Sequence, residues 1–420
     1  MRAKTLATRM LNMLALLVAL VFALLLCLPV ILLPFSTAVP AWAWIPMAAA
    51  DVILLILFAR IKPAYRKAIP LGGMLLVAAI AIFASQRFAT TPPILDEQGK
   101  PVAGSISSLE QMTLNGSRQW VSIRGEDAAK PVLLFLAGGP GGTQLATARF
   151  ALAGLEEHFV VVDWDQPGSG KSLDAVDRST LTPERYIEDA HSLVLQLRQR
   201  FGQEKVYVVG ESWGSALGIL LVQRYPELFH AFAGTGQMVA FLETDRTCYD
   251  WSLQWARERG DTTKVEKLIE QGPPPYYGRR VAWKQATYLM DTFRFMNQNP
   301  AIADNDANTL RDLAGVEYGL YDKVSWFRGV LGTLGIVYPQ LWEVDFRTQA
   351  TQLQVPVYFL IGRHDINAPV ALTQEYFDLL DAPHKQIVWF EHSGHTPWVS
   401  EPDAFVRAMV EVVLAQTQEP

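Results

Sequence analysis

The sequence contains little cysteine, and this scarcity excludes two kinds of site. Only two of the 420 residues are cysteines, Cys27 in an apolar run and Cys248 far downstream. Two such residues can form neither a disulfide framework nor a thiolate metal site. We expect a protein that uses no metal ion and no cofactor.

Acidic residues are almost absent from the first 88 residues, which hold one, Asp51, against eight lysines and arginines. The whole chain has 36 basic and 42 acidic residues, so the remainder has 28 and 41, a formal charge of −13. An acidic domain of this kind is repelled by phosphate backbones. Nucleic acid is therefore not expected as a partner.

The N-terminal part instead contains three apolar stretches, at about 11–33, 42–59 and 69–83. The first has 23 uncharged residues, enough for a helix to cross a hydrocarbon core of about 30 Å. A cleaved signal peptide is the alternative, but its apolar region has only about 7–15 residues. The second stretch contains Asp51 and the third is short, so each could instead lie at the interface or pack on its neighbour.

The distribution of positive charge predicts the orientation of these segments. The N-terminus and the 60–67 loop are basic, whereas the 34–41 connection has no charge. Basic segments stay in the cytoplasm, so three crossings place the chain from about residue 90 outside it. We predict an integral protein of the lipid bilayer, with a cytoplasmic N-terminus and an extracytoplasmic globular domain. Asp51 is either a functional carboxylate inside the membrane or part of a loosely packed helix near Pro46.

From about residue 112, short β-branched runs alternate with amphipathic helical stretches, which predicts an α/β fold with a mostly parallel sheet. An antiparallel hairpin opens the fold, with Asn115-Gly116 as its turn between strands at 112–114 and 119–123. The central strands are expected at 132–136, 159–162, 205–209, 231–234, 357–361 and 386–390. Helices are expected at about 183–201, 215–225, 369–380 and 402–416.

The alternation stops near Gln237 and resumes near Val355, and the residues between have helical periodicity. We interpret this segment as a helical cap inserted between two strands of the sheet. The predicted domains are a membrane region (1–88), two parts of a core (89–236 and 353–420) and the cap (237–352). Most cap aromatics are expected to form a small helical core and a few to line a pocket. They are Trp251, Trp255, Tyr276, Tyr277, Trp283, Tyr288, Tyr318, Tyr321, Trp326 and Trp342.

The strongest chemical signal is Gly210-Glu211-Ser212-Trp213-Gly214, between an expected strand and an expected helix. This is a G-x-S-x-G nucleophile elbow in the strand-turn-helix context that the α/β-hydrolase fold requires. Glycines on both sides permit a tight, strained turn that exposes the serine hydroxyl. Ser212 is therefore the predicted nucleophile.

A serine needs a base to take its proton, and the base needs a group that orients it. In this fold the acid and then the histidine follow the serine along the chain. Asp365 and His395 each follow an expected strand, so their side chains are predicted at the edge of the sheet that carries Ser212. Asp365 is the predicted orienting acid and His395 the predicted base; His364 and His392 are rivals for the base.

Acyl transfer also needs backbone N–H groups that stabilise an oxyanion. Trp213, directly after the nucleophile, is predicted to supply one. The glycine-rich turn 137–142 is predicted to supply the second from Gly139, because Pro140 has no N–H. The segment 168–172 ends like a phosphate-binding loop, but that motif requires a glycine where this chain has Asp165, so nucleotide binding is not expected.

Several of these segments belong to one wider pattern: Gly138-Gly139-Pro140-Gly141, Asp165-Gln166-Pro167-Gly168-Ser169-Gly170-Lys171-Ser172, Gly210-Glu211-Ser212-Trp213-Gly214-Ser215, Asp365 and Gly394-His395. Together they resemble the proline iminopeptidase (prolyl aminopeptidase) branch of the α/β hydrolases, over about 112–236 and 355–416. The resemblance implies a serine peptidase that releases N-terminal residues, preferably proline, from short peptides under a cap that limits their length. It also implies cap carboxylates that bind the substrate amine, for which Glu243 and Asp245 are candidates.

The chain departs from that family at Ala137, where a histidine is usual, at Pro167, where an arginine is usual, and in its membrane segments. These departures leave the predicted triad and oxyanion hole intact and bear mainly on proline specificity. The alternatives are a carboxylesterase or lipase-like enzyme for small or apolar acyl esters, and a non-catalytic binding protein on a hydrolase scaffold. The expected ligand is a small molecule or a short peptide.

Overall fold

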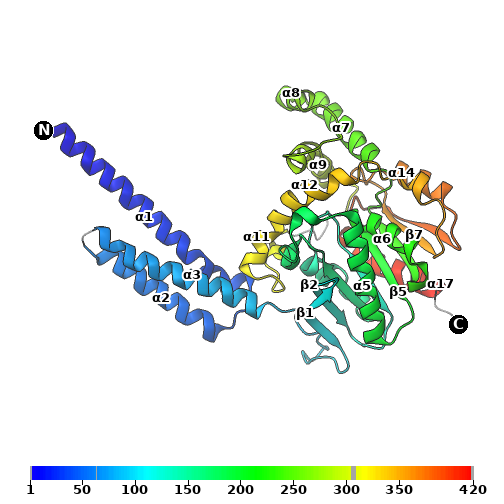
Figure 1. Cartoon of the computed structure of the whole chain (residues 1–420), viewed down its shortest axis with the longest axis horizontal. Coiled ribbons are helices and arrows are strands. Elements are labelled where there is room, and N and C mark those ends of the chain that lie inside the picture. The colour runs from blue at the N-terminus through cyan, green and yellow to red at the C-terminus, as the bar shows by residue number, and fades with distance from the viewer. Residues whose placement is uncertain (1, 63, 304–308, 418–420) are drawn as a thin grey trace. The chain divides into compact units, whose positions relative to one another are not determined.

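The computed structural model describes residues 2–62, 64–303 and 309–417. Its contacts divide the chain into two compact units (Figure 1). One consists of Met1–Thr90 and Leu313–Lys323, and the other of Thr91–Asp312 and Val324–Pro420.

Three long helices make up most of the first unit: α1 (Arg2–Ser36), α2 (Ala41–Arg60) and α3 (Ala68–Phe88). The spans Met13–Ser36, Ala41–Arg60 and Tyr65–Phe88 are long and apolar enough to cross a membrane. The third span is longer than the sequence pattern indicated, because helix α3 continues through Ser85, Gln86 and Arg87. Asp51 is buried between the helices.

The segment Leu313–Lys323 belongs to the first unit because it is bound to the last turns of α3. The backbone N–H of Leu320 donates to Ser85 Oγ at 2.9 Å, and Gln86 Nε2 donates to Asp322 Oδ1 at 2.8 Å. Part of the predicted cap is thus attached to the third apolar helix.

An eight-stranded sheet forms the centre of the second unit, in the order β1-β2-β4-β3-β5-β6-β7-β8. Strands β3 to β8 are parallel, and the β1–β2 hairpin adds to β4 antiparallel. The predicted mostly parallel sheet is therefore confirmed. The strands are β1 (Ile106–Leu114), β2 (Ser117–Gly125), β3 (Val132–Leu136), β4 (Val160–Asp165), β5 (Val206–Glu211), β6 (Phe229–Thr235), β7 (Val357–Gly362) and β8 (Lys385–Phe390).

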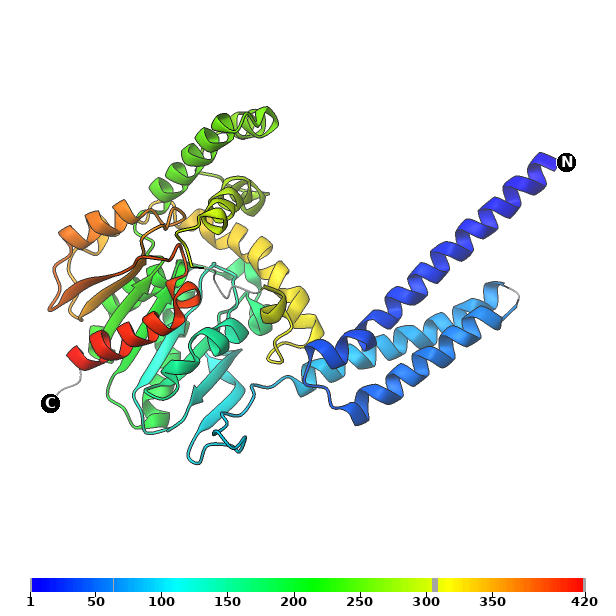
Figure 2. The same ribbon diagram turned by 180° about the vertical axis from the view of Figure 1, so that it is seen from behind.

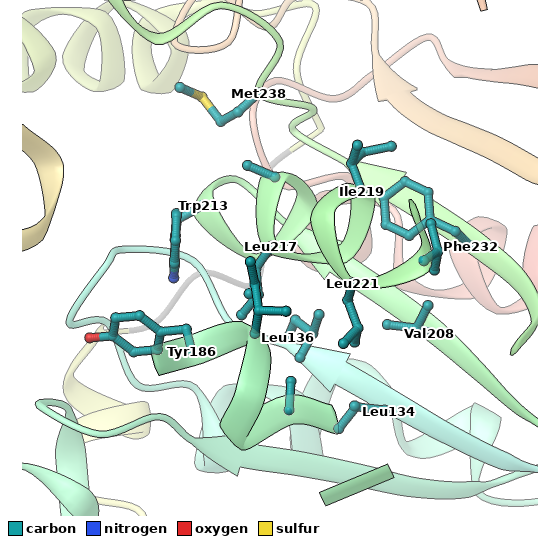
Figure 3. Close-up of a cluster of buried hydrophobic side chains, with 14 of the residues drawn as sticks. Leu134, Leu136, Tyr186, Val208, Trp213, Leu217, Ile219, Leu221, Phe232 and Met238 are labelled. Atoms are coloured by element: carbon teal, nitrogen blue, oxygen red, sulfur yellow. The ribbon is translucent and has the colours of Figure 1, made fainter. Parts of the chain in front are cut away.

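Helices α5 (Pro183–Phe201), α6 (Trp213–Arg224) and α14 (Val370–Leu379) pack on one face of the sheet, where they share a single buried cluster with it. Figure 3 shows part of this cluster, in which Leu134 and Val208 of the sheet lie under Leu217 and Leu221 of α6. Burial of each leucine side chain contributes about 1.5–3 kcal/mol, so this cluster fixes α6, and with it the turn before α6, on the sheet.

The opposite face carries α4 (Leu145–Ala151), α15 (Pro397–Ser400), α16 (Pro402–Arg407) and α17 (Ala415–Thr417), the last two joined by the π-helical residues Ala408–Leu414. Figure 2 shows the C-terminal helices, in red, across this face. Trp398 is fully buried here and meets Phe135 edge to face at 5.0 Å.

Between β6 and β7 the chain forms the predicted helical insertion. Two of the ten cap aromatics, Tyr276 and Tyr288, pack with Tyr249 of α7 in a small cluster of their own. Tyr277, Trp283 and Tyr321 are instead exposed. The helices are α7 (Phe241–Glu258), α8 (Thr262–Gln271), α9 (Val281–Gln298), α10 (Thr309–Leu313), α11 (Leu320–Arg328), α12 (Leu334–Val337) and α13 (Phe346–Gln349).

Candidate active site

The candidate site lies where the parallel strands end. Because β3, β5, β6, β7 and β8 run in one direction, the loops after them gather at one edge of the sheet. Four of the five residues that the sequence singled out lie in these loops, Gly139, Ser212, Asp365 and His395, and the fifth, Trp213, begins helix α6 directly after Ser212.

Ser212 stands in a strained turn between β5 and α6. Its φ is +53° and its ψ −120°, a conformation that few non-glycine residues adopt. A side chain on Gly210 would collide with the Gly214 carbonyl, and one on Gly214 with the Leu136 carbonyl of β3. Glycine is therefore required on both sides of the serine.

Asp365 and His395 are in direct contact: Nδ1 of His395 lies 2.9 Å from Oδ2 of Asp365. The other oxygen, Oδ1, accepts the backbone N–H groups of Asn367 at 2.8 Å and Ala368 at 2.9 Å. Both side chains are buried. The carboxylate is thus fixed by its own loop and engages one ring nitrogen, which leaves Nε2 as the nitrogen available for chemistry.

The rival histidines are placed differently. His392 is at the surface, where Nδ1 lies 3.2 Å from the carbonyl of Ala301, and within the described residues the only histidine hydrogen-bonded to Asp365 is His395. Ser212 is half-buried, and its hydroxyl forms no hydrogen bond with His395 within the described residues. Catalytic hydrogen bonds are often long in a protein without substrate and shorten when substrate binds.

The two predicted oxyanion donors belong to different elements. Trp213 is the first residue of α6, whose first N–H groups have no partner inside the helix. Gly139 has φ +139°, and a Cβ there would lie 2.6 Å from the amide nitrogens of both Gly141 and Gly142. Only glycine can hold the turn in this shape.

Gln166, in the loop after β4, forms hydrogen bonds with Trp213 and with the glycine-rich turn that contains Gly139. Its Oε1 accepts the indole N–H of Trp213 at 2.9 Å, and its Nε2 donates to the carbonyl of Ala137 at 3.0 Å. Asp165 accepts the backbone N–H of Lys171 at 2.7 Å and binds Thr143, which follows the glycine-rich turn. The segment 165–172 therefore holds the glycine-rich turn 137–142 in place.

Glu211, directly before the serine, is a site residue that sequence reasoning missed. It is buried, and its Oε1 lies 3.6 Å from His395 Nε2. Burial alone would lower the pKa of His395, but the carboxylates of Asp365 and Glu211 outweigh it and raise this pKa to about 8. Asn367 is a second missed residue, with Nδ2 3.2 Å from the same ring nitrogen.

A cavity of about 250 Å³ opens beside His395, between the core and the cap helices α9 and α10. Phe293 of α9 meets the imidazole edge to face at 5.9 Å. Of the aromatic residues, Phe293 and Trp398 line this cavity, and none of the ten cap aromatics is among its lining residues. The lining also includes the apolar Met296, Ile302 and Val399 and the polar Gln144, Thr147 and Asp312.

The two cap carboxylates suggested for the substrate amine do not reach this cavity. Glu243 is bound by Arg347 at the surface. Asp245 is fully buried, and Tyr288, Tyr338 and Gln285 all donate to it. Burial raises the pKa of Asp245 to about 6, although those hydrogen bonds oppose the shift. Asp312 of α10 is instead the cap carboxylate at the cavity, where Thr147 Oγ1 donates to it at 2.9 Å.

In the part of the chain that the structure describes, no group of three histidine, cysteine, aspartate or glutamate side chains is arranged to hold a metal ion. Lys171 belongs to the segment 168–172, which is similar to the end of a phosphate-binding loop. Its ammonium group lies 4.4 Å from the centre of the Trp120 ring.

Residues 131–402 match the family described as the alpha/beta hydrolase fold. A probable aminopeptidase of Bacillus subtilis, YbaC, is 30% identical over 319 residues, which cover 74% of this chain and 97% of that protein. A proline iminopeptidase of Lactiplantibacillus plantarum is 24% identical over 70% of this chain and 96% of its own length. The crystal structure of the Mycobacterium smegmatis proline iminopeptidase superposes with a TM-score of 0.54 at 19% identity, over 74% of this chain and 98% of that one.

Proposed function

Because the chain belongs to the alpha/beta hydrolase fold family and is thereby a hydrolase, we propose that it is a membrane-anchored serine hydrolase that acts through an acyl-enzyme. The observation that carries this proposal is the Asp365–His395 hydrogen bond beside a serine in a nucleophile elbow. The similarity to proteins named aminopeptidase and proline iminopeptidase supports a peptidase that acts on short peptides.

In the proposed mechanism Ser212 Oγ attacks the scissile carbonyl carbon while its proton passes to Nε2 of His395. Asp365 holds the Nδ1–H tautomer and stabilises the imidazolium that forms. The carbonyl oxygen becomes an oxyanion bound by the N–H groups of Gly139 and Trp213. The C–N bond then breaks, the amine leaves with the proton from Nε2, and water releases the acyl group by the same steps.

The cavity beside His395 suits a small N-terminal residue. Its volume of about 250 Å³ and its apolar lining from Phe293, Met296 and Ile302 provide room for a compact aliphatic side chain. Asp312 supplies a negative charge for a protonated α-amine. A charge-assisted hydrogen bond of this kind contributes about 1.5–3 kcal/mol, enough to make a free N-terminus a condition for rapid cleavage.

The three apolar helices would anchor this enzyme in the bilayer. The basic N-terminus and the basic 60–67 loop favour a cytoplasmic position for both, and hence an extracytoplasmic catalytic domain. Peptides outside the cytoplasm would then be the substrates.

The test compares prolyl and alanyl amides with their N-acetyl forms and with a short-chain acyl ester, using the full chain in detergent. Free amines should be cleaved about 10–100-fold faster in kcat/KM than the acetylated amides. Asp312→Asn should reduce that preference, whereas Asp250→Asn, a change at the exposed face of α7, should keep it. Equal rates with and without acetylation, together with much faster ester turnover, would contradict the aminopeptidase and favour the esterase.

A further inference from the structure

Glu211 is a buried acid in a position where the nucleophile motif accepts any residue. It ends strand β5, and its side chain turns toward the catalytic edge of the sheet. A side chain on Gly138 would collide with the Glu211 carboxylate and would also lie 3.2 Å from Ser212 Cβ. The Glu211 carboxylate therefore lies beside both Ser212 and the glycine-rich turn 137–142.

A nearby cation stabilises the charged form of a carboxyl group buried in this place. Gln144 Nε2 donates to its Oε2 at 3.2 Å, and among the described residues no lysine or arginine forms an ion pair with it. Burial raises the pKa of Glu211, and the neighbouring imidazole of His395 opposes this. His395, 3.6 Å away, is thus the group that can balance the charge of Glu211.

The contact involves Nε2, the ring nitrogen on which the reaction depends. With Nδ1–H bound to Asp365, a proton on Nε2 makes His395 an imidazolium between two carboxylates, because Glu211 Oε1 lies 3.6 Å from that nitrogen. Loss of this one proton to solvent leaves a lone pair on Nε2, which Asn367 Nδ2, 3.2 Å away, can satisfy as a donor. The site thus has one partner for each protonation state of Nε2.

We propose that Glu211 is a positioning residue that holds the Nε2 proton of His395 in the substrate-free protein and so sets the pH at which Ser212 becomes reactive. This inference rests on the proposed serine mechanism. Other charges around the ring are accounted for: Asp365 binds Nδ1, Asp312 in the same cavity is paired with Arg311 at 3.0 Å, and Phe293, Gly236 and Gln144 carry none.

The rate at which a fluorophosphonate labels Ser212 reports this proton without knowledge of the substrate. In the full-length wild type the rate should rise with pH and reach half its maximum at about pH 8. Glu211→Gln should move that point down by about one pH unit or more, since one of the two neighbouring negative charges is removed. Glu211→Asp, which keeps the charge, should have a midpoint close to that of the wild type.

Glu391→Gln is the matched control, because it removes one negative charge from an exposed ion pair with Arg363 at the end of β8. It should leave the midpoint unchanged. The same midpoint in Glu211→Gln as in the wild type would overturn the inference. A purely structural role would slow labelling at every pH without moving the midpoint, and this outcome would also contradict it.

Direct titration provides a test that needs no labelling of Ser212. The NMR signals of histidine-labelled wild-type protein can be assigned to His395 by their loss in His395→Gln. The inference requires that His395 titrate near pH 8 in the wild type and at a lower pH in Glu211→Gln. The same midpoint in both proteins, or titration of the wild type at or below the ordinary value of about 6.5, would overturn it. If no fluorophosphonate labels Ser212 at any pH, the serine mechanism fails, whereas this pair of NMR titrations still decides the role of Glu211.

Discussion

His395 Nδ1 lies 2.9 Å from Asp365 Oδ2, and both side chains are buried beside the turn that carries Ser212. This hydrogen bond joins the loop after β7 to the loop after β8, thirty residues apart in the chain. It fixes the ring orientation and leaves Nε2 as the nitrogen for proton transfer. The first prediction concerns this contact.

Asp365→Asn should lower kcat by about three to four powers of ten, because an amide can stabilise the wrong tautomer and cannot stabilise the imidazolium. Asp378→Asn, at an exposed position of α14, is the control and should retain full activity. Steady-state hydrolysis of an alanyl amide, with thermal unfolding to check the fold, measures both. A loss of less than tenfold in Asp365→Asn would refute its assigned role.

Gly139→Ala should reduce kcat about 10²–10³-fold, the usual effect of losing one oxyanion donor. The added Cβ would lie 2.6 Å from two backbone nitrogens, so the turn must move. Gly99→Ala provides a comparison, since Gly99 also has a positive φ but has open space around it. Both variants share the strain of a positive φ. Similar activities in the two would therefore mean that Gly139 has no part in the oxyanion hole.

The fold should depend on a buried ion pair at strand β2. Arg124 donates to Glu156 through Nε at 2.6 Å and Nη2 at 3.1 Å, and both side chains are buried. Glu156→Gln leaves the guanidinium without its counter-charge and should reduce the free energy of unfolding by about 3 kcal/mol. Glu184→Gln, which removes an exposed partner of Arg224, should cost less than about 1 kcal/mol. Denaturant unfolding measures both free energies. Equal losses in the two variants would mean that the buried pair contributes no more to stability than the exposed one.

The proposed orientation predicts where cysteines can be labelled. A cysteine at Gln98, in an exposed turn, should react with an impermeant maleimide in intact cells. A cysteine at Lys62 should react only after lysis, because the basic loop is cytoplasmic in this account. The native Cys27 and Cys248 are buried and give little background. The opposite result at Gln98 would mean that the chain crosses the bilayer twice rather than three times.

Local signals in the sequence were sufficient to predict most helices and strands of the core. The helix expected at 183–201 has those bounds, because Thr182 caps it by accepting the N–H of Arg185 and Gly202 ends it in a left-handed conformation. The first strand was predicted too short. Strand β1 begins at Ile106, and its polar residues 107, 108 and 110 give no hydrophobic signal at the edge of the sheet.

The site residues fall into two groups, those that a local signal in the sequence could identify and those that have no such signal. Ser212, Asp365 and His395 could be selected because each follows a recognisable strand, and parallel strands end at one edge. Glu211, Asn367 and Phe293 have no such signal, since their proximity to His395 arises only when three distant segments pack together. The extension of α3 could not be predicted from the sequence either, because Gln86 donates a hydrogen bond to Asp322, which is far along the chain.

The measurement that tests the central claim most directly is covalent labelling of the full-length protein by a fluorophosphonate, with the adduct located by peptide mapping. The account predicts one adduct, on Ser212, in the wild type and none in Ser212→Ala. Ser400→Ala, a substitution at a serine that lines the cavity beside His395, should be labelled like the wild type. Equal labelling of Ser212→Ala and the wild type, or an adduct on a different residue, would contradict the assignment of Ser212 as the nucleophile.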